Sequence, residues 1–283
     1  MADANQLWRT FVPRGSELAL RVCSALVLAP LAIGIAYLGR WPFALIWGIA
    51  AVGVLWEWTS LVAGADRRFV LTTGAASLAL AFALVASGLF LAAVIVLAVG
   101  TLAAASLAPA ERRMWVAGGI PYAGALGVAP IVLRSDGEDG FLAVIFLFAV
   151  VWTTDIAAYF IGRGVGGPRL MPHVSPNKTW SGALGGTAAA AGVAIALAAA
   201  SGLSGLFALA MLAILLSAFA QAGDLFESFL KRRFGAKDSS HLIPGHGGLM
   251  DRLDGFIAAS VAAMLIGLAR GGLEAPGRGL LVW

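Results

Sequence analysis

The stretch GDLFESFLKRRFGAKDSSHLIPGHGGLMDRLDG, residues 223–255, is the densest polar passage in a 283-residue chain that is otherwise mostly Ala, Leu, Val and Gly. Five acidic and five basic side chains crowd into it, and apolar runs precede and follow it. Because long apolar runs belong inside a bilayer and clustered charges do not, this passage predicts a polar site at a membrane surface. The rest of the chain is then the scaffold that holds the site there.

The composition indicates an integral membrane protein. Hydrophobic residues make up 60% of the chain and charged residues 12%, which is too apolar for an ordinary soluble protein. The net charge of +4 is small, and its distribution fits membrane topology better than nucleic-acid binding. The lone cysteine, Cys23, excludes an internal disulfide and lies in an apolar run, where we expect it to pack.

Nine apolar runs predict an all-α polytopic bundle of about nine transmembrane helices in one domain, residues 1–283, since each run is near the ~20 residues that span a bilayer core. The runs cover residues 22–38, 42–62, 70–87, 89–106, 114–133, 141–162, 182–200, 205–226 and 254–270. Residues 70–106 leave an alternative open, because only Ser87 and Gly88 separate two runs that could form a tight hairpin or one long span.

Charge asymmetry favours the hairpin. With nine spans and a cytoplasmic N-terminal segment, residues 1–21, fifteen of the nineteen Lys and Arg residues lie in inner segments, as the positive-inside rule requires. The four in outer segments are Arg40, Arg134, Arg270 and Arg278. No convincing cleavage site follows the first run, so we expect a retained helix. We expect a bacterial-type inner membrane, with the active site in residues 141–270 facing the cytoplasm.

Carboxylates in the polar passage have the spacing of a metal site. If the preceding helix continues, Asp224 and Glu227 stand three residues apart on one face, and Asp251 and Asp254 repeat this spacing at the next helix. Such carboxylates suit Mg2+, and phosphate oxygens can complete the coordination shell of the ion. The glycines around His246 could present backbone N–H groups to phosphate. A glycine-rich turn beside a solvated charge cluster is the alternative.

A second polar stretch, residues 153–186, precedes the seventh span. Asp155 lies inside an apolar run, which makes it a functional candidate, with a structural hydrogen bond as the alternative. SPNKTW, residues 175–180, brings Lys178 to the start of a helix, where anions are favoured. GRGVGG formally fits G-x-G-x-x-G, but no strand precedes it, so the dinucleotide-fold interpretation fails and only a flexible glycine loop near phosphate stays open.

Two further features concern packing. Glu57, in WEWTS near the inner end of the second span, is expected to have a structural role, pairing with a basic loop. Gly182 and Gly186 stand at GxxxG spacing, which allows helices to pack closely in lipid.

The string SFLKRRFGAKDSSHLIPGHGGLMDRLD, residues 228–254, is similar over nearly its whole length to the signature of phosphatidate cytidylyltransferases, also called CDP-diacylglycerol synthases. The SPNKT stretch, and Asp155 followed shortly by Ala-Tyr, resemble that family's upstream pattern. The chain departs from it at Ser181, where the family usually has Glu, and at Ile156, where a hydroxyl residue is common. The resemblance implies that CTP and phosphatidate react to give CDP-diacylglycerol and pyrophosphate.

This reaction makes electrostatic demands, because the lipid phosphate is already ionised and needs no base, whereas the leaving pyrophosphate must be neutralised. We expect four catalytic residues: Asp224, Asp251, Lys237 and Arg252. Mg2+, with a second cation left open, would be held by carboxylates among Asp224, Asp251, Asp254, Glu227 and Asp155. Phosphate groups would be bound by residues among Ser175, Lys178, Lys231, Arg232, His246, Gly247 and Gly248. A Lys237–Asp238 pair is the structural alternative for Lys237.

The expected partners are CTP, phosphatidate and the lipid bilayer, with no nucleic acid. A homodimer is plausible for a bundle rich in Gly and Ala, although nothing in the spacing demands it. Two other functions stay open. Asp251–Gly255 reads D-x-x-D-G, as in CDP-alcohol phosphotransferases, but the match stops after five residues. A cation- or proton-coupled transporter could use Asp155 and Asp224 within the membrane, but the polar residues cluster at one face.

Overall fold

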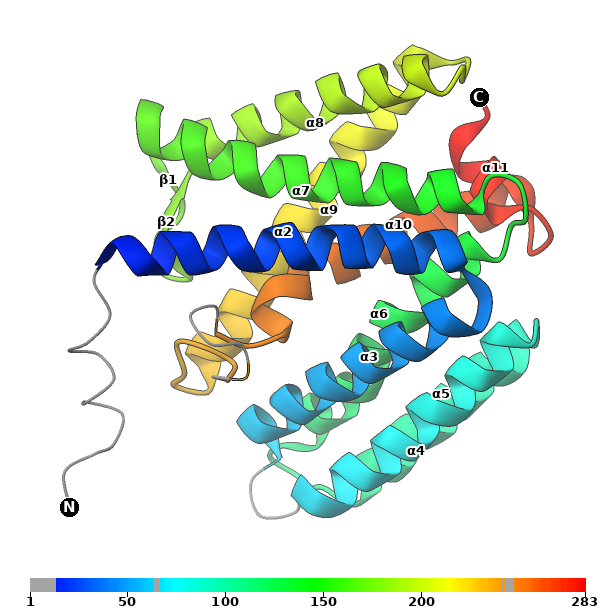
Figure 1. The fold of residues 1–283 in the computed structure, drawn as a ribbon. Coiled ribbons are helices and arrows are strands. Elements are labelled where there is room, and N and C mark those ends of the chain that lie inside the picture. Colours follow the sequence, from blue (N-terminus) through cyan, green and yellow to red (C-terminus); the bar gives the residue numbers. More distant parts are fainter. Residues whose placement is uncertain (1–13, 64–66, 241, 243–246) are drawn as a thin grey trace.

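The computed structural model describes residues 14–63, 67–240, 242 and 247–283, and for residues 14–25 the backbone alone. Ten helices and two strands follow one another in this part of the chain (Figure 1). They are α2 (Arg14–Leu38), α3 (Arg40–Val62), α4 (Arg67–Ala86), α5 (Phe90–Ser106), α6 (Arg113–Arg134), α7 (Gly140–Val165), β1 (Arg169–Met171), β2 (Ser175–Thr179), α8 (Trp180–Ala200), α9 (Leu206–Arg233), α10 (Met250–Gly271) and α11 (Pro276–Leu281).

Each of the nine predicted spans coincides with one helix, from α2 to α10. Seven of these helices, α3, α4 and α6 to α10, are long and apolar enough to cross a membrane. The apolar part of α2, Leu26–Leu38, and α5 are shorter, so a full count of nine spans stays a prediction. The all-α prediction needs one correction, because β1 and β2 pair as an antiparallel hairpin between α7 and α8.

The open question at residues 70–106 is resolved by two helices, α4 and α5, that reverse direction at Ser87–Gly88. Gly88 has a φ of 82° and donates its N–H to the carbonyl of Val85 at 2.9 Å. Glycine adopts this left-handed conformation without a steric penalty, because it has no Cβ atom. The prediction of a tight hairpin is therefore confirmed, since two helices and not one long span occupy residues 70–106.

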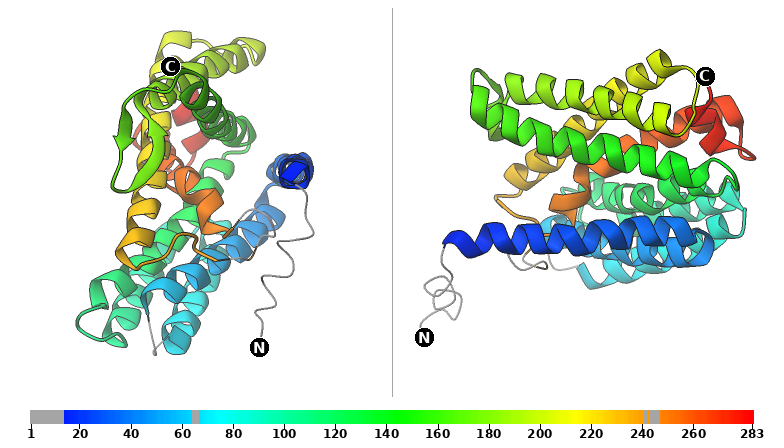
Figure 2. Two further views of the ribbon diagram at one scale, coloured as in Figure 1. Left: turned by 90° about the vertical axis from the view of Figure 1, so that its left-hand side faces the viewer. Right: turned by 45° about the horizontal axis from the view of Figure 1, so that its top comes forward.

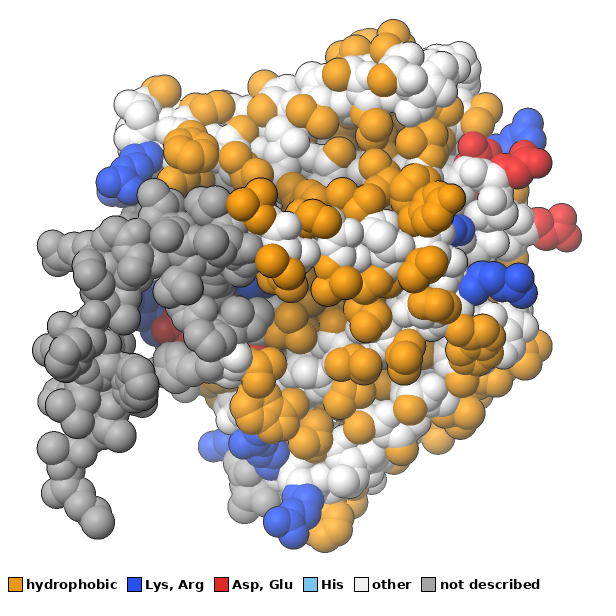
Figure 3. Space-filling view, viewed as in Figure 1, with side chains coloured by type: hydrophobic (Ala, Val, Ile, Leu, Met, Phe, Trp, Pro, Cys, Tyr) orange, Lys and Arg blue, Asp and Glu red, His pale blue; other side chains and the backbone are white. Residues whose placement is uncertain are grey.

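On the face seen in Figure 3, charged side chains lie toward the two ends of the bundle and apolar side chains predominate between them. The β-hairpin, the α9–α10 connection and the start of α4 lie at one end, whereas the α6–α7 loop and α11 lie at the other (Figure 1). An apolar band between charged ends is what a bilayer requires of a protein that spans it. Which end faces the cytoplasm stays a prediction.

Glycines set the closest helix contacts. A Cβ atom built at Gly182 of α8 would lie 2.7 Å from the carbonyl oxygen of Ala158 in α7, and one at Gly186 would lie 2.7 Å from that of Thr154. Since real Cβ contacts are longer than this, these positions accept only glycine without a shift. The prediction of close packing at Gly182 and Gly186 is confirmed.

Candidate active site

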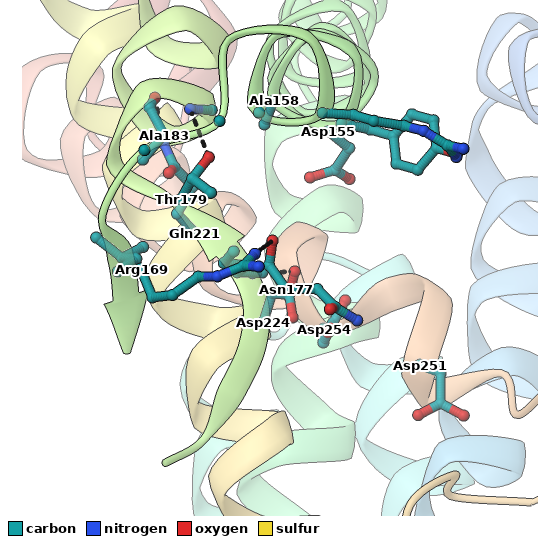
Figure 4. A pocket seen from close by; sticks show the side chains of 18 of the residues that line it. Asp155, Ala158, Arg169, Asn177, Thr179, Ala183, Gln221, Asp224, Asp251 and Asp254 are labelled. Carbon is teal, nitrogen blue, oxygen red and sulfur yellow. Dashed lines mark hydrogen bonds and ion pairs between the residues drawn. The ribbon is translucent and has the colours of Figure 1, made fainter. Parts of the chain in front are cut away.

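A cavity of about 810 Å³ lies at the end of the bundle that carries the β-hairpin (Figure 4). Its walls come from the last turns of α7, the β-hairpin, the start of α8, the second half of α9 and the start of α10. The cavity contains both signs of charge. The charged and amide side chains that line it are Asp155, Arg163, Arg169, Asn177, Lys178, Gln221, Asp224, Asp251, Arg252 and Asp254.

Two glycines bring α9 and α10 together beside this cavity. A Cβ at Gly223 would lie 2.5 Å from the backbone oxygen of Asp254, and one at Gly255 would lie 3.0 Å from that of Ala220. Each glycine is adjacent in sequence to a cavity carboxylate. The crossing therefore directs Asp224 and Asp254 into the same cavity from facing helices (Figure 4).

A buried hydroxyl and amide network supports the wall made by α7, α8 and α9. Ser217 accepts a hydrogen bond from Thr154 at 2.9 Å and bonds Thr187 at 3.0 Å. Gln221 donates its Nε2 to Thr187 at 3.0 Å, so three helices share one network. Because polar groups buried in an apolar interior must be paired, this network helps to hold Asp155, which follows Thr154, and Asp224, which lies one helical turn after Gln221.

The β-hairpin carries a basic residue into the cavity. Lys178 of β2 forms an ion pair with Asp224 of α9, and Figure 2 shows the hairpin beside α9. Thr179 caps α8 by accepting the N–H of Gly182 at 3.1 Å. Ser181, where the resemblance leads us to expect Glu, donates its hydroxyl to the carbonyl of Gly166 and so ties the α7–β1 loop to α8.

A second charge cluster centres on Lys231. Its Nζ lies 2.6 Å from a carboxylate oxygen of Glu227 and 2.5 Å from one of Asp251. The other oxygen of Asp251 accepts the N–H groups of Gly248 at 2.8 Å and Ser239 at 3.1 Å. Lys231, expected to bind phosphate, thus neutralises two carboxylates, and Asp251 fastens the loop that precedes α10.

The predicted site residues divide into two groups. Six line the cavity: Asp155, Lys178, Asp224, Asp251, Arg252 and Asp254. Seven do not: Ser175, Glu227, Lys231, Arg232, Lys237, Gly247 and Gly248. His246 lies outside the described residues. Of the five acids considered as metal ligands, Glu227 is the one that does not line the cavity, and it is buried in an ion pair with Lys231.

Three charged or amide side chains that line the cavity were not singled out from the sequence: Arg163, Arg169 and Gln221. Gln221 precedes Asp224 by three residues, so helical periodicity alone could have found it. Arg169 and Asn177 reach the cavity because the hairpin folds over it, and Arg169 donates to the carbonyl of Asn177 at 3.3 Å. No local pattern signals that arrangement.

The carboxylates that line the cavity supply only part of the ligand shell that a magnesium ion needs. Within the described ranges, no three His, Cys, Asp or Glu side chains lie close enough together to hold a metal ion. Magnesium usually needs only one or two carboxylates, because substrate phosphates and water complete its shell. Asp224 and Asp254, which line the cavity from facing helices, fit that requirement, and Asp155 lines the same cavity.

Comparison with known proteins agrees with this picture. Residues 19–269 match the profile described as the Cytidylyltransferase family. The phosphatidate cytidylyltransferases of Brucella suis and Brucella melitensis are each 40% identical to the chain over 260 residues, which cover 89% of this chain and 94% of the relative. That of Staphylococcus saprophyticus is 41% identical over 133 residues, or 47% of this chain and 51% of the relative.

Proposed function

The chain belongs to the cytidylyltransferase family, and on that premise we propose that it transfers the cytidylyl group of CTP to phosphatidate, giving CDP-diacylglycerol and pyrophosphate. The supporting observation is the cavity itself, which holds acids and bases together at one end of an apolar bundle. Such a cavity can receive a water-soluble polyphosphate at the membrane surface and a lipid phosphate from the bilayer.

The chemistry needs positive charge more than it needs a base. An oxygen of the lipid phosphate forms a bond to the α-phosphorus of CTP, and the bond from that phosphorus to the β-phosphate oxygen breaks. Two anions approach each other and pyrophosphate leaves with added charge, so fixed cations stabilise the transition state. We assign this task to Lys178 and Arg252, with Arg163 and Arg169, which also line the cavity.

We propose that Asp224 and Asp254 hold Mg2+ together with phosphate oxygens of the substrate. A magnesium ion there would supply charge neutralisation and hold the phosphates in line. The carboxylate of Asp224 is paired with Lys178, so substrate phosphates that draw Lys178 away would leave this carboxylate available. Asp251 is expected to act mainly through the contacts that it makes with Lys231 and the loop before α10.

The orientation of the chain in the membrane is inferred from the positions of its basic loops. The starts of α4 and α6 and the segment that joins α7 to α8 carry basic residues at the end with the cavity (Figure 1), and basic loops favour the cytoplasmic side. We therefore propose a bacterial-type inner membrane, with the cavity open to the cytoplasm, where CTP is available.

The two alternative functions lack comparable support. A CDP-alcohol phosphotransferase would require further acids after Asp254, and α10 continues with Phe256, Ile257 and Ala258. A transporter requires polar groups across the membrane, whereas the charged cavity residues gather at one end.

The deciding experiment measures pyrophosphate release by the detergent-purified protein. Phosphatidate is supplied with CTP, UTP, ATP or GTP, each with and without Mg2+. We expect turnover only with CTP, phosphatidate and Mg2+ together. A folded protein that releases no pyrophosphate with any nucleotide would overturn the proposed reaction, and turnover unaffected by a metal chelator would overturn the magnesium assignment alone.

A further inference from the structure

Glu57 of α3 is a fully buried carboxylate that lies outside the cavity. Each of its oxygens accepts one hydroxyl and one backbone N–H. Oε1 is 2.5 Å from Ser240 Oγ and 2.8 Å from the nitrogen of Leu249. Oε2 is 3.1 Å from Ser239 Oγ and 2.6 Å from the nitrogen of Met250. Among the described residues, the partners of Glu57 are thus these four neutral donors, where the sequence led us to expect a basic loop.

Two of these donors are the N–H groups of Leu249, the N-cap residue of α10, and of Met250, the first residue of that helix. The N-terminus of a helix carries partial positive charge and unpaired donors, so it favours a carboxylate. Capping usually comes from the residue just before the helix, but Leu249 has no side-chain acceptor. Glu57, almost two hundred positions earlier, supplies the cap from another helix.

The same bonds fasten the segment before α10. Ser239 Oγ lies 3.1 Å from Glu57 and 3.0 Å from Asp251 Oδ2, so one hydroxyl stands between two carboxylates. The space is fully used, because a Cβ at Gly248 would lie 1.8 Å from Ser239 Oγ and 2.7 Å from Glu57 Oε1. The position of the first turn of α10 is therefore set by Glu57 together with Asp251.

That turn carries Asp251, Arg252 and Asp254 into the cavity. The cavity-lining residues in the described part of the chain all fall between Asp155 and Asp254, so no described side chain of the helices before α7 lines the cavity. We infer that Glu57 is a positioning residue through which the N-terminal half of the bundle holds the acidic and basic groups of α10 in register with α9. This inference rests on the proposed function for its catalytic consequence, but the contact itself does not.

The test is Glu57→Gln, with Glu111→Gln as the matched control. Glutamine keeps the size of the side chain, but its NH2 group would face a backbone N–H instead of accepting from it. Glu111 is exposed in the turn that precedes α6 and is not among the residues that line the cavity. Misplacing catalytic groups by about 1 Å can cost about 100-fold, so we expect Glu57→Gln to lower kcat by about that factor, while the KM for CTP changes by less than about threefold.

The second readout does not depend on activity. Deuterium uptake by peptides that cover residues 236–252 is expected to rise in Glu57→Gln and to stay at the wild-type level in Glu111→Gln, while peptides from α7 and α8 keep wild-type protection. Unchanged uptake, or kcat within threefold of wild type in a folded variant, would overturn the inference. An inactive wild-type enzyme with the expected uptake pattern would overturn the proposed function and leave the contact established.

If Glu57→Gln does not fold, Ser240→Ala decides, because it removes one of the four donors and leaves the carboxylate. We expect a smaller loss of kcat, about three- to tenfold, with increased uptake in the same peptides. Wild-type kcat and uptake in Ser240→Ala would contradict the inference. Where both single variants fold, the kcat of the double variant should be no lower than that of Glu57→Gln, since both substitutions act through one contact. A kcat lowered by the product of the two single losses would contradict a shared contact.

Discussion

The crossing of α9 and α10 makes a quantitative prediction about activity. Replacing Gly223 by Ala would place a Cβ 2.5 Å from the backbone oxygen of Asp254 and 2.8 Å from the Cβ of Ala258. Ordinary contact begins at 3.4 Å, so the two helices must separate by about 0.9 Å at this point. Neither neighbour is the end of a flexible side chain that could turn away, so the backbones themselves must move.

The helices would separate between Asp224 and Asp254, the two carboxylates that are proposed to hold one Mg2+ together. Overpacking of this kind costs about 1–3 kcal/mol of stability, and a displacement near 1 Å costs about 100-fold in rate. Gly255→Ala is milder, since its Cβ would lie 3.0 Å from the backbone oxygen of Ala220. Gly192→Ala in α8 is the control, because a Cβ there meets nothing within 4 Å.

The assay is CTP-dependent pyrophosphate release by the three variants, with the apparent Tm measured on the same preparations. We expect activity to fall in the order Gly192→Ala, Gly255→Ala, Gly223→Ala, with the first at wild-type level and the last lowest. A folded Gly223→Ala enzyme within twofold of wild type, or an inverted order, would refute the argument that the glycine crossing sets the carboxylate geometry.

Two further predictions concern the hairpin and the buried network. Lys178→Gln removes the cation beside Asp224 and should lower kcat/KM for CTP by about 100-fold. The control is Arg233→Gln, which removes an exposed cation outside the cavity and should leave kcat/KM within about threefold of wild type. Equal losses of kcat/KM in the two variants would argue against a contact between Lys178 and phosphate. Ser217→Ala removes the hydroxyl that bonds both Thr154 and Thr187. It should lower the free energy of unfolding by about 0.6–1.7 kcal/mol, measured as a lower apparent Tm in detergent. An unchanged Tm would contradict the proposed role of the network.

The fold could be predicted from the sequence where lipid dictates it. Apolar runs of about twenty residues gave every helix from α2 to α10, and the charge distribution correctly favoured a reversal at Ser87–Gly88. The β-hairpin was missed because three-residue β1 has no alternation that a pattern could detect. Its strands are held by each other and by the ion pair of Lys178 with Asp224, which are contacts between distant segments.

The site was predictable where periodicity acts within one helix. Asp224 and Asp254 were identified by their three-residue spacing from Glu227 and Asp251 beside apolar runs, and the structure brings both to one cavity. The partners of these acids could not be derived in the same way. Lys231 is bound by a carboxylate four residues away and by another twenty residues away, and only the second contact depends on how α9 and α10 pack.

Charge pairing explains how so apolar a bundle tolerates this site. A buried ion without a partner costs several kcal/mol, and hydrogen-bonded partners offset that cost. Lys178 is paired with Asp224, and Lys231 joins Glu227 to Asp251, while Glu57 has four donors. Because the contacts that make burial tolerable also orient the groups in the cavity, a change to any partner acts on stability and on catalysis at once. Separating the two effects therefore requires activity and unfolding to be measured on the same preparation of each variant.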